Sequence, residues 1–459
     1  MRDRRLVVLL LASLGSACAS TEVDPREDQE RARALIREAL GPVEIFDPQA
    51  PPLSESEIEA TLADGLGLDE ALRLALLNSR RLQAGFLALG IARADFVQAG
   101  LLRNPSLGVG FLFPSGGGSP KITADFVQSL VDLWELPARQ EVAEQLVQQR
   151  VYELSRFAGA LVVDTKDAYF ESVARRELLA TARESADLAR AVLDAVRLRV
   201  QEGVATAIEE NLAQSQALDA ELVLRSAERE STGAQRRLAA LLSLEGDLLP
   251  VALVDALPEP GPSEIDREGL VLRSRASRLD LRASEAALLS AEAQLALERR
   301  RAMPDVELGV SFERPEGGGS VDALAGPGVA VELPIFDRNQ VQVRRAEFRR
   351  DELQREHDAL AAEIGQEVRA AVDRAAASAR VARFVAEELL PQAERGLELA
   401  RDSYSLGDTT LLAVLESQRA ALQARSTRIE ALLEAARTGV EVERAAGACR
   451  EVLETPVRE

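Results

Sequence analysis

Residues 303–315 read MPDVELGVSFERP and residues 104–114 read NPSLGVGFLFP. After each proline, apolar residues occupy every second position: Leu107, Val109, Phe111 and Phe113 in the earlier stretch, and Val306, Leu308, Val310 and Phe312 in the later one. This period of two predicts a β-strand with one apolar face and one small or polar face. A Gly-rich turn and a weaker alternating run follow each stretch, at 122–126 and 329–335, so the sequence predicts two β-hairpins.

The hairpins occupy equivalent places in an internal duplication. Each follows a helical run that ends at a proline, and each precedes a Leu-Pro pair and a long Ala-rich helix that runs to Gly203 or Gly407. The texts RVQEGVAT and SYSLGDTT mark the two helix ends. Shorter helices are expected at about 66–103, 206–243, 266–303 and 410–448. Heptad spacing from Leu415 to Ala436 predicts that the helices pack side by side.

These patterns divide the chain into six parts. A basic start followed by the apolar run Leu6–Ala17 is typical of a secretory signal peptide, and Pro-rich stretches mark a tether and a linker. The expected parts are a signal peptide (1–17), a lipid-anchored N-terminal tether that is extended apart from a helix around 28–40 (18–65), a first repeat (66–245), an inter-repeat linker (246–265), a second repeat (266–450) and a C-terminal tail (451–459).

Cys18 stands where the apolar run ends, after the sequence Leu14-Gly15-Ser16-Ala17. This context resembles the lipobox of bacterial lipoproteins, in which the cysteine becomes the acylated first residue. We therefore predict Cys18 as a lipidation site. An ordinary cleavage site beside an incidental cysteine is the alternative. If Cys18 is acylated, Cys449 has no intrachain thiol to pair with, so no disulfide framework is expected.

Composition excludes several functional classes. The 459 residues carry a formal charge of −21, which would repel a nucleic-acid backbone. His357 is the only histidine, so the sequence lacks the residues for a His/Cys metal cluster, and a His-based catalytic triad is not expected. We predict a protein that is not an enzyme, with no catalytic residues, no metal site and no cofactor.

The predicted strands have the length of tilted membrane strands, but four of them cannot close a barrel. An open edge in lipid would leave backbone N–H and C=O groups without hydrogen bonds. Three copies would supply about twelve strands, which is enough for closure. The same closure would wrap the long helices into a tube. The sequence therefore predicts a homotrimeric hollow conduit.

Over about residues 65–450, the chain resembles the TolC family of bacterial outer membrane efflux proteins. The resemblance is closest to the lipid-anchored members of this family that serve multidrug or heavy-metal efflux. The motifs that carry the resemblance are LPIFDRNQVQVRRAE (333–347), WELPARQEVAE (134–144) and YSLGDTTLLAVLESQRAALQ (404–423), together with the duplicated unit. The resemblance implies a mainly α fold with membrane β: a coiled-coil α-barrel in the periplasm and a twelve-stranded trimeric β-barrel in the outer membrane.

The resemblance also implies partners, namely a periplasmic adaptor protein, an inner-membrane pump and outer membrane lipid. The expected function is the outer membrane channel of a tripartite efflux system for small molecules or metal ions. Two alternatives remain: a duct for type I protein secretion, and a lipid-anchored coiled-coil scaffold without a pore. The pump sets the cargo in this family, so the sequence does not identify the cargo.

The two helix ends are the candidate functional positions. Gly203 and Gly407 suit chain reversal because glycine readily adopts positive φ, and Thr206 and Thr410 suit the N-caps of the returning helices. By resemblance, these turns form the periplasmic entrance and contact the adaptor; alternatively, they are only turns.

Six acidic residues lie around the turns: Glu202, Glu209, Glu210, Glu398, Asp402 and Asp408. Rings of identical carboxylates in a narrow mouth would attract cations. Asp402 and Asp408, with Glu398, are the gate candidates, and solvated charges on a helix exterior are the alternative.

Overall fold

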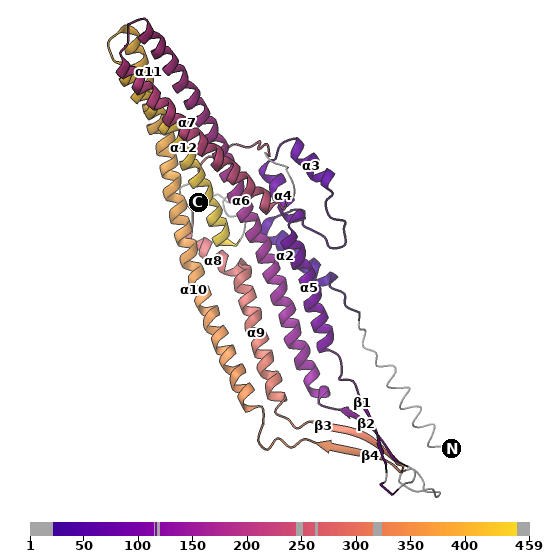
Figure 1. Ribbon diagram of the computed structural model, residues 1–459. Helices are drawn as coiled ribbons and strands as arrows, with labels where there is room; N and C mark the ends of the chain where they lie inside the picture. The colour runs from indigo at the N-terminus through magenta and orange to yellow at the C-terminus, as the bar shows by residue number, and fades with distance from the viewer. Residues whose placement is uncertain are drawn as a thin grey trace. The chain divides into compact units, whose positions relative to one another are not determined.

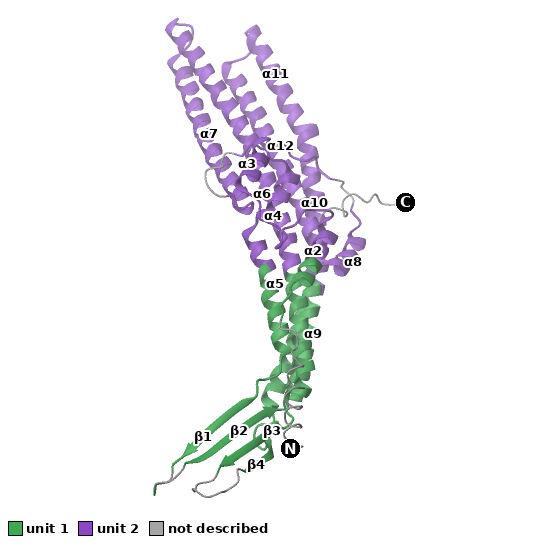
Figure 2. Cartoon of the chain, turned by 90° about the vertical axis from the view of Figure 1, so that its right-hand side faces the viewer, with its two compact units in different colours: residues 1–32, 87–153, 280–360 green, residues 33–86, 154–279, 361–459 purple. Residues whose placement is uncertain are grey.

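The structure is a computed structural model that describes residues 22–113, 115–116, 120–244, 251–261, 265–314 and 324–447. Cys18, the predicted signal peptide and the predicted tail lie outside these residues. The described chain is mostly helical and carries one four-stranded sheet (Figure 1). It divides into two compact units, coloured in Figure 2: unit 1 holds residues 1–32, 87–153 and 280–360, and unit 2 holds residues 33–86, 154–279 and 361–459.

The sheet of unit 1 confirms both hairpins. Its strands are β1 (Ser106–Leu112), β2 (Lys121–Ser129), β3 (Val306–Arg314) and β4 (Leu324–Val331), all antiparallel and in the order β1-β2-β3-β4. The register aligns the apolar positions in rows across the sheet, such as Leu107, Phe126, Val310 and Pro327. Neighbouring rows contain small or polar residues, such as Gly108, Asp125, Ser311 and Gly326.

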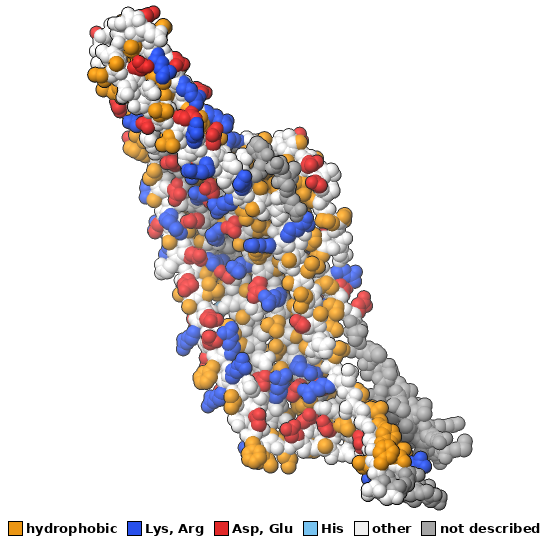
Figure 3. All heavy atoms as spheres, viewed as in Figure 1, with side chains coloured by type: hydrophobic (Ala, Val, Ile, Leu, Met, Phe, Trp, Pro, Cys, Tyr) orange, Lys and Arg blue, Asp and Glu red, His pale blue; other side chains and the backbone are white. Residues whose placement is uncertain are grey.

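One face of the sheet is therefore apolar and exposed, and hydrophobic side chains gather over the strands in Figure 3. Among the residues that the structure describes, each of the two outer strands, β1 and β4, has one edge without a partner strand. Pro327 lies on β4, where an edge strand tolerates a residue without an N–H group.

The predicted position of the fourth strand was wrong by several residues. The sequence placed Leu333 and Ile335 in the strand, but β4 ends at Val331. Pro334 explains the difference, because a proline has no N–H to donate to a ladder and restricts the residue before it. The Ile335 N–H instead donates to the Leu333 carbonyl in a tight turn, at 2.8 Å.

Four helical segments continue from the strands of unit 1, in the row α5, α6, α9, α10 (Figure 1). Their helices are α5 (Arg80–Ala99), α6 (Asp132–Gln201), α9 (Leu279–Arg300) and α10 (Gln340–Phe384). The contacts that fix the row are Arg93 with Glu144, Arg300 with the Trp134 carbonyl, and Arg299 with Glu347. The edge helices, α5 and α10, thus adjoin the edge strands, β1 and β4.

Unit 2 holds the helices that return from the two turns. They are α7 (Ala207–Leu241) and α12 (Leu411–Ala446), beside the later part of α6 and the run α10, η1 (Val385–Leu389) and α11 (Leu390–Leu406). Shorter helices α4 (Leu68–Asn78) and α8 (Arg267–Ser277) precede α5 and α9. None of the helices in the described ranges combines the length and hydropathy that crossing a membrane requires.

Two helices that the sequence predicted as continuous, at 66–103 and 266–303, are each broken once. The breaks fall at Ser79 and Arg278, whose ψ angles of 111° and 123° leave the helical region. Both breaks are fixed by side chains that donate to carbonyls at the end of another helix of the same repeat. Asn78 Nδ2 donates to the Leu242 and Ser243 carbonyls, and Ser277 Oγ donates to the Ala446 carbonyl. The two repeats therefore also share the position and the stabilisation of these helix breaks.

Replacing Asn78 by Ala is expected to lower the free energy of unfolding by about 1–3 kcal/mol, because two carbonyls at the end of α7 lose their donor in a buried position. Thermal unfolding followed by circular dichroism measures the effect. Asn211, exposed on α7, provides the matched Asn→Ala control. Equal melting temperatures for the two variants would contradict this role.

The predicted tether also needs correction. The helix expected around 28–40 is present as α2 (Arg26–Leu40), but a second helix, α3 (Glu55–Ala63), follows it. Ile36 and Ile45 are almost completely buried, and Phe46 packs against Phe86 with ring centroids 5.9 Å apart. Burial of these apolar side chains holds the segment against the helices, so the described part of 18–65 is packed and not an extended chain.

Candidate functional site

Both predicted turns lie in unit 2 and have the expected backbone. Gly203 has a φ of +73° and Gly407 a φ of +81°, in the left-handed region that favours glycine. Gly407 ends α11, and its N–H donates to the Tyr404 carbonyl at 3.0 Å. After Gly203, the Val204 N–H donates to the Arg199 carbonyl at 2.8 Å.

The predicted threonines cap the returning helices. Thr206 precedes α7 and forms a capping box, in which its Oγ1 accepts from the Glu209 N–H at 3.3 Å and its own N–H donates to Glu209 Oε2 at 2.7 Å. The Thr206 backbone N–H and hydroxyl hold the pKa of Glu209 below its usual value. Thr410 precedes α12, where its Oγ1 accepts from the Ala413 N–H at 3.4 Å.

A side-chain contact that the sequence did not predict joins the two helical hairpins near their turns. Arg199 Nη1, at the end of α6, donates to Tyr404 Oη on α11. Leu411, at the start of α12, packs against a small apolar cluster formed by Leu193, Val196 and Ala213 of the other hairpin. The guanidinium and this cluster therefore hold the hairpins together.

Of the six acidic residues near the turns, Glu209 and Glu210 have polar partners, whereas Glu202 is exposed and takes part in no ion pair among the described residues. Glu209 belongs to the capping box, and Glu210 Oε1 lies 3.3 Å from Arg197 Nε within its own hairpin. The gate candidates Glu398, Asp402 and Asp408 are exposed, and none takes part in an ion pair within the part of the chain that the structure describes. Glu398 and Asp402 are four residues apart on α11, so they share one face of that helix.

Apolar side chains are also exposed beside the turns. Ile208 and Leu406 are 80% and 76% exposed, and Val204 and Leu412 are exposed as well. Apolar residues gathered at a chain reversal mark a surface suited to a protein contact.

Changing Gly407 to Ala is expected to lower the free energy of unfolding by about 1–2 kcal/mol, since a Cβ disfavours the left-handed backbone. Gly396 is the matched control: it lies inside α11, and a Cβ there would meet no atom within 4 Å. Gly396→Ala should stabilise the helix by about 0.5–1 kcal/mol. Thermal unfolding compares the two variants, and a change of the same sign in both would argue against strain at the turn.

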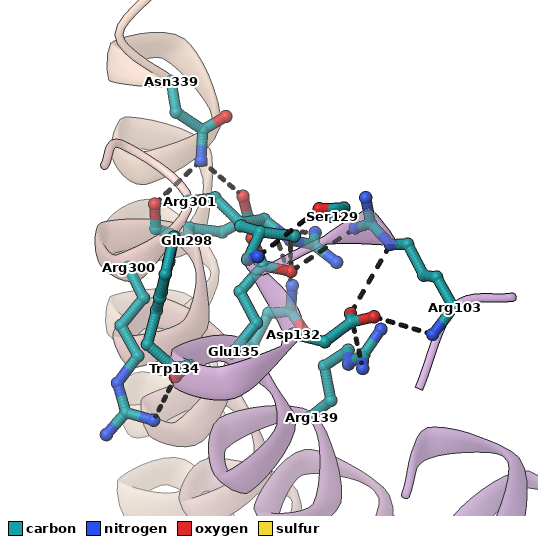
Figure 4. A network of polar contacts seen from close by, with 12 residues as sticks. Arg103, Ser129, Asp132, Trp134, Glu135, Arg139, Glu298, Arg300, Arg301 and Asn339 are labelled. Carbon is teal, nitrogen blue, oxygen red and sulfur yellow. Dashed lines mark hydrogen bonds and ion pairs between the residues drawn. The ribbon is translucent and has the colours of Figure 1, made fainter. Parts of the chain in front are cut away.

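Besides the turns of unit 2, a buried polar network lies in unit 1, where the strands join the helices (Figure 4). Asp132, at the start of α6, is almost completely buried; its Oδ1 lies 2.9 Å from Arg139 Nη2, and its Oδ2 accepts from the Arg103 backbone N–H at 2.7 Å. The buried Glu135 lies 3.7 Å from both Arg103 and Arg301. These residues connect the end of α5, the start of α6 and the end of α9.

Asn339 explains the motif LPIFDRN. It holds a φ of +59°, and its Nδ2 donates to Glu298 Oε2 at 2.7 Å and to the Glu298 carbonyl at 2.8 Å (Figure 4). The Asp337 carboxylate accepts from the Asn339 N–H at 2.8 Å. The segment thus ties the chain before α10 to the end of α9. The sequence predicted the segment but not Glu298, because nothing local to Glu298 indicates this partner.

Comparison with protein families gives one match over most of the chain. A family model described as "Outer membrane efflux protein" matches residues 71–243 and 270–448.

Curated relatives have similar lengths. The cobalt-zinc-cadmium resistance protein CzcC of Cupriavidus metallidurans is 28% identical over 371 residues, covering 79% of this chain and 85% of the relative. The pyoverdine export outer membrane protein OpmQ of Pseudomonas aeruginosa is 27% identical over 400 residues, covering 79% of this chain and 83% of the relative.

Solved structures share the fold. The CmeC outer membrane channel of Campylobacter jejuni aligns with a TM-score of 0.72 at 18% identity, over 90% of this chain and 92% of that one. The MtrE outer membrane channel of Neisseria gonorrhoeae aligns with a TM-score of 0.67 at 20% identity, over 90% of this chain and 98% of that one.

Proposed function

The chain belongs to the outer membrane efflux protein family, and from this premise we propose that it works as a passive trimeric duct joined to a periplasmic adaptor protein and an inner-membrane pump. It is an efflux channel of the outer membrane that extends into the periplasm. The family match removes the alternative of a coiled-coil scaffold without a pore. The family contains channel proteins, so we propose no enzymatic activity.

One observation carries the proposal of several copies: the four-stranded sheet is exposed on its apolar face, and neither of its edges is paired by another strand of the described residues. In lipid, the apolar face is favourable but the two open edges are not, because their N–H and C=O groups have no water to bind. Pairing β4 of one copy with β1 of the next satisfies both edges and closes a ring. Three copies then supply about twelve strands.

The turns at Gly203 and Gly407 form the adaptor contact in this proposal. Exposed Val204, Ile208 and Leu406 supply the apolar part of the contact surface. Thr206 and Thr410 keep the turns rigid by capping the returning helices, which reduces the conformational entropy that is lost on docking.

The carboxylates of Asp402, Asp408 and Glu398, which have no ion-pair partner among the described residues, form the proposed gate. Three copies of each, around a narrow mouth, would concentrate negative potential and favour cations. The hydrogen bond between Arg199 and Tyr404 stabilises the closed mouth, because widening the mouth requires the two hairpins to separate and this bond to break.

We propose divalent metal cations as the cargo, supported by the gate carboxylates and by the similarity to a cobalt-zinc-cadmium resistance protein. A siderophore is the second candidate, because another relative is named for pyoverdine export. An acylated Cys18 would anchor the chain at the outer membrane, with about 0.8 kcal/mol from each buried methylene.

To test the cargo, this chain is expressed together with the adaptor and pump encoded by neighbouring genes, in a bacterium that lacks its own outer membrane duct. Cellular cobalt, zinc and cadmium should fall when the chain is present and should stay high when it is left out. Unchanged metal contents together with lower retention of a siderophore would reassign the cargo. Secretion of a protein substrate, with neither small cargo affected, would favour the protein-secretion duct.

A further inference from the structure

The helix α11 begins at a break in the regular helical hydrogen bonding. In η1, the Leu390 N–H donates to the Val385 carbonyl, five residues earlier instead of four. Pro391 follows directly and has no N–H, so the Glu387 carbonyl cannot receive the bond that an α-helix would supply there. A π-turn and a proline are both features at which helices bend. Residues 385–391 therefore form a joint at the base of α11.

The burial of side chains changes at this joint. Before it, the later part of α10 buries a side chain every three or four residues, as at Ala379, Ala382 and Val385, each at most 4% exposed. After it, within the described range 324–447, none of the residues of α11 is buried. Because buried apolar contacts hold a helix in place, α11 is the less firmly held part of this run.

The first repeat is different at the equivalent place. Pro391 lies sixteen residues before its turn glycine, and Asp187 lies sixteen residues before the other turn glycine. Asp187 is inside α6, which is one continuous helix over Asp132–Gln201. Leu193 and Val196, further along α6, are buried. The first hairpin therefore has a continuous and packed helix where the second hairpin has a joint.

The returning helix α12 is also held firmly. Its first residue, Leu411, packs against the small apolar cluster of the first hairpin. Leu415, Ala421 and Ala424 follow on α12 and are buried. The start of α12 is therefore fixed against the first hairpin, whereas α11 is not.

The side chains of α11 contact other elements near its two ends. The helix lies beside α12 (Figure 1). Close to the joint, Glu394 lies 3.1 Å from Arg425 of α12. Close to the turn, Tyr404 accepts a hydrogen bond from Arg199 of α6. When α11 pivots at its base, the first contact moves little and the second breaks. The two gate candidates on α11 lie between these contacts.

We propose that α11 is the part of the gate that moves: it pivots as a rigid helix at the joint and at Gly407, while α12 keeps its place against the first hairpin. Hinges are a few residues at the ends of elements that absorb the change in backbone angles. This motion rests on the proposed trimeric duct. It deepens that function by assigning the opening of the mouth to one helix and not to the whole second hairpin.

Changing Pro391 to Ala tests the joint. The new backbone N–H can donate to the Glu387 carbonyl, so bending there then costs a hydrogen bond. The open probability of the reconstituted full chain should fall about threefold to tenfold. The melting temperature should not fall, because alanine favours a helix. Single-channel recording and thermal unfolding measure the two effects.

Gly396→Ala is the matched control on α11. It also favours the helix, but it adds no N–H, and its Cβ would meet no atom within 4 Å. Its open probability should equal that of the parent chain. An unchanged open probability in the Pro391 variant, or an equal fall in both variants, would overturn the joint and leave the duct standing. Monomers in native mass spectrometry would overturn the duct itself.

Distances between spin labels locate the moving part. Arg401 is exposed and lies ten residues beyond Pro391, about 15 Å along the helix. An added bend of about 20° at the joint moves it by about 5 Å. Labels on Arg401→Cys and Asp194→Cys of α6 should therefore move apart by about 5 Å when Arg199 is changed to Ala.

The control pair reports on α12. Labels on Asp194→Cys and Arg419→Cys, both at exposed positions, should keep their distance in the same comparison. Both pairs are built in a Cys449→Ser background and measured in trimers that hold one labelled copy. Equal lengthening of the two distances would show that the whole second hairpin moves. That result, or no lengthening of the first distance, would overturn the proposal.

Discussion

Changing Arg199 to Ala is expected to raise the open probability of the reconstituted channel about tenfold or more. The guanidinium donates to Tyr404 Oη across the two hairpins, and a hydrogen bond to a charged group contributes about 1.5–3 kcal/mol. Losing that energy shifts the equilibrium between closed and open mouths by about 10-fold to 100-fold for each copy. Single-channel recording in planar bilayers measures the shift.

Two further variants test whether the Arg199–Tyr404 hydrogen bond itself keeps the mouth closed. Tyr404→Phe keeps the ring but removes the acceptor, so it should raise the open probability like Arg199→Ala. Arg197→Ala is the matched control, because Arg197 pairs with Glu210 inside its own hairpin and links nothing across the turns. A similar rise in the Arg197 variant, or no rise in the Tyr404 variant, would show that the contact between hairpins does not hold the mouth closed.

Changing Asp132 to Ala should lower the free energy of unfolding by about 2–4 kcal/mol, because the partly buried Arg139 loses its counter-charge and the Arg103 backbone N–H loses its acceptor. Asp132 is 1% exposed and compensates Arg139, while its second oxygen accepts from the Arg103 backbone. The loss would loosen the junction from which both β1 and α6 start. The melting temperature of the detergent-extracted protein reports the effect.

Asp187 supplies the control for this variant. It also pairs with an arginine, Arg190 at 2.9 Å, but on an exposed helix surface where solvent screens the charges. Asp187→Ala should leave the melting temperature close to that of the parent chain. If the Asp132 and Asp187 variants melted together, the buried network of Figure 4 would not be a main source of stability for unit 1.

The sequence predicted those features whose cause is local. Alternation in steps of two indicated three strands close to their observed bounds, and the helix caps at Thr206 and Thr410 follow from a cap residue beside a chain reversal. The fourth strand was misplaced because its apolar alternation continues past Val331, whereas Pro334 ends the hydrogen-bonded ladder.

Features that depend on distant residues escaped prediction. Arg199 and Tyr404 are 205 positions apart, and Asn78 reaches carbonyls 164 and 165 positions away. The breaks at Ser79 and Arg278 arise from such partners and not from a helix-breaking residue. In the same way, the segment predicted as a tether is packed because Ile36 and Ile45 find apolar neighbours that composition alone does not reveal.

In the proposed function, this chain forms a closed conduit only as several copies. The most direct test measures the native mass and the single-channel conductance of one detergent-extracted sample. We predict a three-chain mass and a small, cation-selective conductance that rises when Asp402 and Asp408 are changed to Ala. A correctly folded monomer that gives no conductance after verified insertion would contradict it.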